Sequence, residues 1–277
     1  MQLGQIVLAL LVLNIKIVAF HCFNNVKIHK RAAIHGVEAN KASLSWFPDI
    51  INLSNIFQPK QSNDVKKNDK MEIELNRITA IINDNVSLLK NAAETKNENS
   101  DEVVNALLSL EKLMREKNKL DNGQTAEETI KYLDGSWRLV FTTGTVDTQK
   151  KLGGRINYFP IKAVQSFNID TNTIANGIYV GNASIIKFFG VFTWNDKSRK
   201  LEFDFDQVSL FGFKFNLPSG GAAKIGQSTG LGSENNEQLI ATGKRPFFNW
   251  ISADSNIATA RGGGGGLALW QRVNDAI

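Results

Sequence analysis

From residue 137 onward the chain alternates apolar and polar side chains, and this period of two constrains its fold more than any other feature. The clearest segment is 201–206, in which leucine and phenylalanine alternate with glutamate and aspartate. Such alternation predicts a strand with one face on a core and the other in water. Strand-like segments are expected at 137–142, 164–169, 174–180, 185–194, 201–206, 208–217, 239–241, 257–261 and 267–273. Short strands separated by turn residues at this spacing predict an antiparallel sandwich or barrel.

Two helices are expected before the strands, over residues 71–121. Apolar residues recur at helical spacing from Met71 to Leu89, and a second stripe follows Ser100, the expected N-cap, and stops at Asn122-Gly123. Amphipathic helices of this kind either cover a sheet or lie on a membrane surface. We expect them to cap the sheet, after a solvated linker over residues 49–70.

The distribution of histidine and cysteine restricts the chemistry of the chain. All three histidines and the single cysteine lie within the first 35 residues, so residues 36–277 contain neither. Ser-His-Asp and Cys-His catalysis, thiolate metal sites and disulfides are therefore excluded from that part of the chain. Carboxylate, lysine and tyrosine chemistry remains open. We expect no catalytic site, no metal site and no cofactor.

The net charge of +5 belongs mostly to the N-terminal segment. Residues 1–48 carry five basic residues against one glutamate, and the remaining 27 basic and 26 acidic residues nearly cancel. The body of the protein is thus close to neutral and has no dense basic patch interleaved with aromatic residues. Nucleic acid is therefore not an expected partner.

Residues 1–48 have the composition of a two-part targeting leader. An apolar run over residues 6–13 resembles the core of a secretory signal, and residues 20–47 are basic and poor in acids, as in transit peptides. A signal followed by a transit-like segment is typical of import into plastids that are bounded by extra membranes. Plain secretion is the alternative.

The two ends of the strand region carry the most specific motifs. The first strand opens with Gly135-Ser136-Trp137, and the chain later reads Ala260-Arg261-Gly262, four further glycines and Leu267-Ala268-Leu269-Trp270. Glycine accepts the positive φ that tight turns need. Across residues 71–273 the chain resembles the fibrillin family, also called plastid-lipid-associated proteins. Where that family often has an acidic residue after the Arg-Gly, this chain has glycines, which implies a divergent subgroup.

The resemblance implies both a fold and a function. The fold is mainly β with N-terminal helices: a lipocalin-like antiparallel β-barrel of eight or nine strands over residues 132–277, capped by two helices. Gly135, Trp137, Arg261 and Gly262 are expected to close the barrel, with the Arg261 guanidinium across the Trp137 ring. The implied function is binding of an isoprenoid or acyl lipid (carotenoid, quinone or fatty acid) and association with thylakoids or plastoglobules.

Phenylalanines mark the expected ligand site. Thirteen of the 17 lie between residues 141 and 248. Those assigned to the inward faces are Phe141, Phe167, Phe203, Phe205, Phe213 and Phe215, with Glu202, Asp204, Asp206 and Lys214 on the opposite faces. An apolar lipid and a membrane or lipid-globule surface are the expected partners. Two alternatives stay open: a filled barrel acting as a scaffold on a membrane or photosynthetic complex, and a lipid-modifying enzyme that uses carboxylates alone.

Two further segments have a polar or glycine-rich pattern. The carboxylates of Glu202, Asp204 and Asp206 share one strand face, which is the solvent side of a sheet or, alternatively, a site for a divalent cation. We expect the first. Residues 219–237 are rich in Gly, Ser and Asn and are expected to form a hairpin connection or a lid over the barrel mouth.

Overall fold

The computed structural model describes residues 61–218, 221–222 and 242–274, with side chains placed from Lys70 onward. Within these ranges the chain forms four helices and a ten-stranded antiparallel sheet. The elements are α2 (Gln61–Thr95), α3 (Ser100–Leu120), α4 (Gln124–Leu133), β1 (Gly135–Thr142), α5 (Val146–Leu152), β2 (Asn157–Tyr158), β3 (Lys162–Asn168), β4 (Thr173–Val180), β5 (Ala183–Asn195), β6 (Lys200–Leu210), β7 (Phe213–Asn216), β8 (Phe247–Ala253), β9 (Ile257–Gly262) and β10 (Leu267–Val273). The expected leader, the expected strand at 239–241 and most of the 219–237 segment lie outside the described residues.

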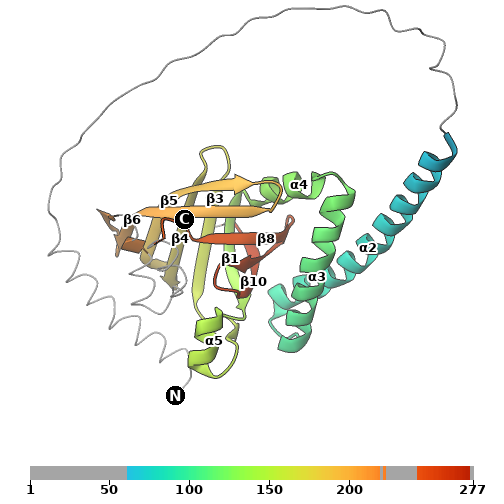
Figure 1. Cartoon of the computed structure of the whole chain (residues 1–277). Coiled ribbons are helices and arrows are strands. Elements are labelled where there is room, and N and C mark those ends of the chain that lie inside the picture. The colour runs from blue at the N-terminus through green and yellow to red at the C-terminus, as the bar shows by residue number, and fades with distance from the viewer. Residues whose placement is uncertain (1–60, 219–220, 223–241, 275–277) are drawn as a thin grey trace, which may run out of the picture.

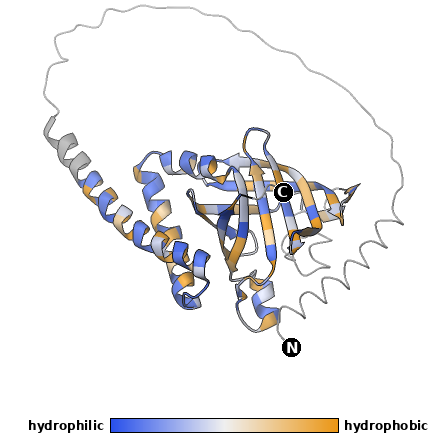
Figure 2. Cartoon of the chain, turned by 180° about the vertical axis from the view of Figure 1, so that it is seen from behind, coloured by the Kyte–Doolittle hydropathy of each residue, from blue (hydrophilic) through white to orange (hydrophobic). Residues whose placement is uncertain are grey.

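The sheet is ring-like (Figure 1). Its strand order is β10-β9-β8-β6-β5-β4-β3-β1, and β1 also pairs with β10; β2 and β7 are attached to β1 and β6. The register places Trp137 opposite Arg272 and Phe141 opposite Leu269. The expected pairing of the first strand with the strand of residues 267–270 is confirmed. Hydrophobic and hydrophilic residues alternate along the strands (Figure 2), because the strands that form the ring each have one face inside it.

The helices begin at positions that differ from those expected. Helix α2 starts at Gln61, so the last ten residues of the expected 49–70 linker are helical. The N-cap of α3 is Asn99, not Ser100, and its side-chain oxygen accepts hydrogen bonds from the backbone N–H groups of Asp101 and Glu102. Helix α4 was not expected. It follows Gly123, whose φ of 93° turns the chain after α3 and allows a new helix to start.

Helices α2 and α3 pack on the outside of the ring. Ile78 and Leu89 of α2 and Leu107 and Leu110 of α3 form one buried cluster with side chains of β1, β8, β9 and β10. The sheet residues in this cluster are Val140, Phe141, Ile251, Ile257, Leu267 and Leu269. Burial of each such side chain contributes about 1.5–3 kcal/mol. Figure 1 shows α2 and α3, together with α4, gathered on one side of the sheet.

A second buried cluster fills one end of the ring interior. It contains Trp137, Phe167, Ile174, Phe192 and Trp250, together with Leu133 at the end of α4. The rings of Phe167 and Trp250 meet edge to face, with centroids 5.5 Å apart. This end of the ring is therefore filled by aromatic side chains, and we call it the closed end.

Strands β6 and β8 differ from the strands expected there. The sequence predicted separate strands at 201–206 and 208–217, but β6 runs without a break to Leu210. The turn comes after it, at Phe211 and Gly212, which both have positive φ. Strand β8 was missed because residues 246–251 do not alternate: Phe247 and Phe248 are adjacent, and so are Trp250 and Ile251. Trp250 points into the ring, whereas Ile251 packs against the helices, and a bulge at Ile251 then shifts the register of β8 against β9.

Candidate functional site

A cavity of about 330 Å³ lies inside the ring, away from the closed end. Its walls come from strands on all sides of the ring and from the start of α5. The lining residues are Leu139, Thr142, Gly144, Thr145, Thr148, Ile156, Phe159, Ala163, Gln165, Asn176, Ile178, Phe188, Phe203, Asp204, Phe205, Ala222, Pro246, Phe248, Gly262, Gly266, Ala268 and Trp270. The volume falls within the range of small-molecule sites, which begins near 300 Å³.

Aromatic rings form the most continuous part of the cavity wall. Phe203 stacks on Phe248 with centroids 5.2 Å apart, and Phe205 lies 5.3 Å from Phe203. Trp270 meets Phe248 edge to face at 5.8 Å. These rings belong to β6, β8 and β10, so strands distant in sequence contribute to one apolar surface. Such a surface suits the hydrocarbon part of a ligand.

Two of the six expected cavity phenylalanines, Phe203 and Phe205, line the cavity. Phe167 points inward but belongs to the filled closed end. Phe215 is half-buried and packs beside the cluster at the opposite end without lining the cavity. The expectation for Phe213 was wrong: it is 72% exposed, because the short β7 pairs only with β6 and stands outside the ring.

Phe141 was also assigned to the wrong face. A bulge at Val140 shifts the register of β1 against β10, so the alternation that starts at Trp137 and Leu139 does not continue. Phe141 therefore packs on the outside of the ring with the helices and meets Tyr158 edge to face at 5.2 Å. Thr142 takes the inward position and lines the cavity.

Two amides belong to the polar part of the wall. Gln165 on β3 and Asn176 on β4 are directly opposite in the antiparallel register, and both line the cavity. Neither residue type was singled out in the sequence. An alternating strand pattern with a glutamine or asparagine at an inward position is the signal that could have found them.

The closure of the ring uses a different arginine from the one expected. Arg261 does not lie on Trp137; the guanidinium carbon of Arg272 lies 4.2 Å from the centroid of that ring. Arg272 also donates hydrogen bonds to the backbone carbonyls of Asp134 and Tyr132, and Trp137 donates its indole N–H to the carbonyl of Leu133 at 2.8 Å. The strand register explains the exchange, since Trp137 is opposite Arg272. Burial lowers the pKa of Arg272.

The two glycines expected at the closure have separate positions. Gly135 starts β1 at a φ of 109°, and a Cβ atom there would lie 2.8 Å from Nη1 of Arg272. The backbone conformation therefore requires glycine, which also leaves room for the arginine side chain. Gly262 ends β9, accepts the N–H of Gly265 and lines the cavity.

Arg261 instead joins β9 to α3. Its Nε donates to the carboxylate of Glu111 at 2.9 Å, its Nη1 donates to the carbonyl of Gly265 at 2.8 Å, and Arg115 contacts the same carboxylate at 2.7 Å. Burial acts to raise the pKa of Glu111, but the hydrogen bonds and charges of Arg261 and Arg115 outweigh it and lower the pKa below its usual range. This ion cluster is structural and lies on the helix-covered side of the ring.

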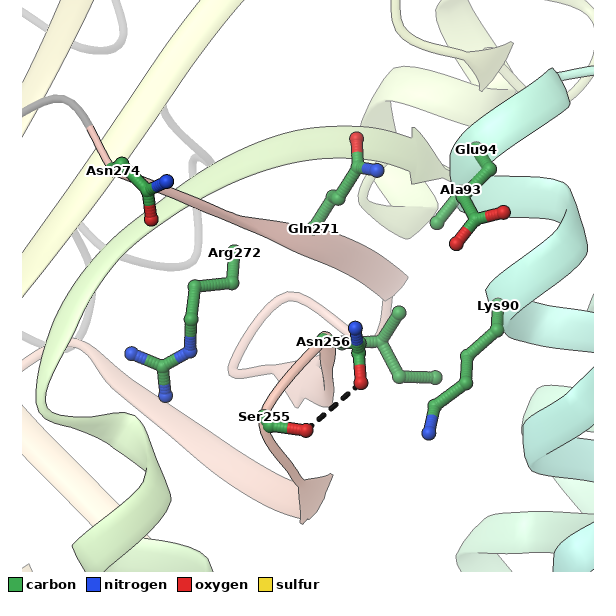
Figure 3. Close-up of a pocket in the computed structure, with 9 residues that line it drawn as sticks. Lys90, Ala93, Glu94, Ser255, Asn256, Gln271, Arg272 and Asn274 are labelled. Carbon is green, nitrogen blue, oxygen red and sulfur yellow. Dashed lines mark hydrogen bonds between the residues drawn. The ribbon is translucent and has the colours of Figure 1, made fainter.

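A smaller hollow of about 200 Å³ lies between α2 and the β9–β10 side of the sheet (Figure 3). Lys90, Glu94, Asn256, Gln271 and Arg272 are among its lining residues. Its cations already have partners, because Lys90 pairs with Asp254 at 3.0 Å and Arg272 lies on Trp137. The larger, aromatic cavity is therefore the candidate site.

The carboxylates of β6 do not form a metal centre. Glu202 pairs with Lys200 along the strand, and Asp204 is the one acidic residue among the described residues that line the cavity. In the described ranges, no three His, Cys, Asp or Glu side chains come together in a way that could hold a metal ion. Nor does any helix of these ranges combine the length and apolar character needed to cross a membrane.

Comparisons of the chain with protein-family models, with curated proteins and with solved structures gave no match.

Proposed function

We propose that this protein binds an isoprenoid or acyl lipid inside its ring of strands, as a lipocalin-like β-barrel of the fibrillin type. The observation that carries the proposal is the cavity of about 330 Å³, lined by Phe203, Phe205, Phe248 and Trp270. Each CH₂ group moved from water into such a cavity gains about 0.8 kcal/mol. Because the wall is built from paired strands, the site is preformed and requires little ordering on binding.

A plastid setting is part of the proposal. The composition of residues 1–48 supports import, and the resemblance of the strand-end motifs to plastid-lipid-associated proteins supports residence at thylakoids or plastoglobules. Sequencing the N-terminus of the native protein tests the import step. A mature chain that begins at Met1 contradicts it.

Exposed apolar residues favour a second activity, association with a lipid surface. Phe211 and Phe213 are 62% and 72% exposed at the β6–β7 turn, and Val180 is exposed at the neighbouring β4–β5 turn. Soluble surfaces rarely expose two phenylalanines side by side without a binding role. The nearby Lys214 lies over the Phe189 ring at 5.0 Å and adds positive charge to the patch.

Mass spectrometry of an organic extract of the purified full-length protein tests lipid binding directly. A matched pair of variants then locates the site. Phe203→Trp enlarges a side chain of the cavity wall, so the affinity for the neutral apolar dye Nile red should fall about tenfold or more, equivalent to about 1.4 kcal/mol. Phe213→Trp makes the same change outside the ring and should leave the affinity unchanged. Equal effects of the two variants would contradict binding in the cavity.

A further inference from the structure

We infer that Gln165 and Asn176 form a hydrogen-bonding subsite for an uncharged oxygen of the ligand, a carbonyl or a hydroxyl, and that the cavity disfavours a carboxylate. This inference rests on the proposed function, because it specifies the ligand class for the same cavity. It narrows an isoprenoid or acyl lipid to a ketone, quinone or alcohol rather than a free fatty acid.

The position of the two amides suits a ligand that enters with one polar group. Gln165 and Asn176 are opposite each other on β3 and β4, and directly opposite residues of an antiparallel pair have Cβ atoms about 4.5–5.5 Å apart. The next inward pair on one side is Phe167 and Ile174, in the filled closed end. The inward pair on the other side is Ala163 and Ile178, which lines the cavity. The amides therefore lie at the inner end of an apolar cavity.

The burial of these amides points to a role inside the cavity. Gln165 is only 5% exposed, and its side chain and that of Asn176 both line the cavity. Buried polar groups in proteins are nearly always bonded to protein, water or ligand. Two of the threonines in the wall already have partners: Thr142 donates to the carbonyl of Leu267, and Thr145 accepts the N–H of Thr148. The two amides, which line the cavity, are placed to bind a polar group of a ligand there.

The charge of the wall selects against an anion. No described lining residue is a lysine, arginine or histidine, and the one charged residue, Asp204, is negative. A carboxylate in the cavity would lose its hydration without gaining a counter-ion, which is costly. An amide has both donor and acceptor groups, so it can donate to a carbonyl or hydroxyl oxygen and accept from a hydroxyl. An uncharged oxygen therefore fits both the hydrogen-bonding capacity and the charge of the wall.

The test compares three probes of equal chain length, dodecane, dodecan-1-ol and dodecanoate, as competitors that displace Nile red from the full-length protein at neutral pH. We expect dodecan-1-ol to bind roughly three- to tenfold more tightly than either of the others, the range for one net hydrogen bond. Equal or tighter binding of dodecanoate overturns the inference while leaving lipid binding intact. Failure of all three probes, and of Nile red itself, overturns the proposed function.

Variants assign the preference to the two amides. Gln165→Leu and Asn176→Leu should each remove most of the advantage of dodecan-1-ol and leave the affinity for dodecane unchanged. Gln207→Leu, the same substitution on β6 outside the cavity, is the matched control and should preserve the advantage. Circular dichroism checks folding, and if Gln165→Leu does not fold, Asn176→Leu and the wild-type comparison decide. An advantage that survives in a folded Asn176→Leu variant overturns the role of the pair.

Discussion

At the scale of single residues, the carboxylate of Glu111 contacts two arginines within the described part of the chain. It is 8% exposed and lies between Arg261 of β9 and Arg115 of its own helix. Such a carboxylate is stable because two guanidinium groups replace the water it has lost. Removing it would leave two cations facing each other at the junction of helix and sheet.

We therefore predict that Glu111→Gln lowers the free energy of unfolding by about 2–3 kcal/mol at neutral pH. The folded-state pKa of Glu111 lies below its ordinary value of 4.5, so the unfolded chain takes up the proton first as the pH falls. The contribution is present above pH 4.5 and is lost as the pH falls through the lower folded-state pKa. Glu111→Gln should therefore also reduce the loss of stability in acid.

Urea unfolding at neutral and acid pH measures both effects. Glu127→Gln is the control, because its ion pair with Lys131 is 3.9 Å long and both side chains are largely exposed. It should change stability by less than about 0.5 kcal/mol. If the two variants lose the same stability, the Glu111 cluster has no special role.

At the scale of strands, the pattern of the sequence predicted the sheet better than it predicted the faces. Alternation and end glycines indicated the antiparallel sheet and the pairing of β1 with β10. The bulge at Val140 breaks the alternation of β1, so that Phe141 lies on the outer face beside Val140, and the bulge at Ile251 shifts the register of β8 against β9. A single sequence shows no signal for a bulge when both neighbours are apolar, so Phe141 and β8 could not be placed correctly.

The exchange of Arg261 and Arg272 has a related cause. Both arginines lie near the C-terminus on paired strands, and only the register of β1 against β10 decides which one meets Trp137. The cavity residues show the same dependence on register. Alternation alone predicted that Phe203 and Phe205 face inward, whereas the juxtaposition of Gln165 and Asn176 follows only from the pairing of β3 with β4.

Strand packing yields a second prediction, at Gly190 of β5. This glycine faces the bulge between β5 and β6, where an added Cβ atom would collide with the Asp204 carbonyl oxygen and lie 2.8 Å from the Phe205 Cα. Because backbone atoms cannot move aside as side chains do, Gly190→Ala should cost about 1–3 kcal/mol of unfolding free energy.

Gly154→Ala is the matched control for this change. A Cβ atom at Gly154 would have nothing within 4 Å, so the substitution should stay within about 0.5 kcal/mol of the wild type. Thermal unfolding of the two variants makes the comparison. A Gly190→Ala protein as stable as Gly154→Ala would show that the two strands can separate there without cost.

At the scale of the whole molecule, the ring has two chemically different ends. The closed end holds Trp137 and Trp250 and receives α4. The opposite end has exposed apolar residues on α5 and on two turns, namely Val146, Leu152, Val180, Phe211 and Phe213. Lys162 and Lys187 lie over the Tyr179 ring near the same end, at 5.3 and 5.7 Å. A surface that contacts anionic lipid is expected to combine exposed apolar side chains with nearby cations, as this end of the ring does.

The difference between the two ends leads to the last prediction. The turn at Phe211 and Phe213 should anchor the protein to a lipid surface, and the cavity should face that same surface. The double variant Phe211→Ser/Phe213→Ser should lose most of its co-sedimentation with phosphatidylcholine vesicles that contain phosphatidylglycerol, because two exposed rings leave the apolar contact. Val191→Ser removes another exposed apolar residue, 46% exposed on the outside of β5 and away from the turn, and should sediment like the wild type. If vesicle binding also weakens with added salt, the lysines at this end of the ring contribute to it.

The affinity for Nile red should stay the same in all variants, since neither substitution touches the cavity wall. If the double variant sediments fully, this end of the ring is not the lipid-facing one.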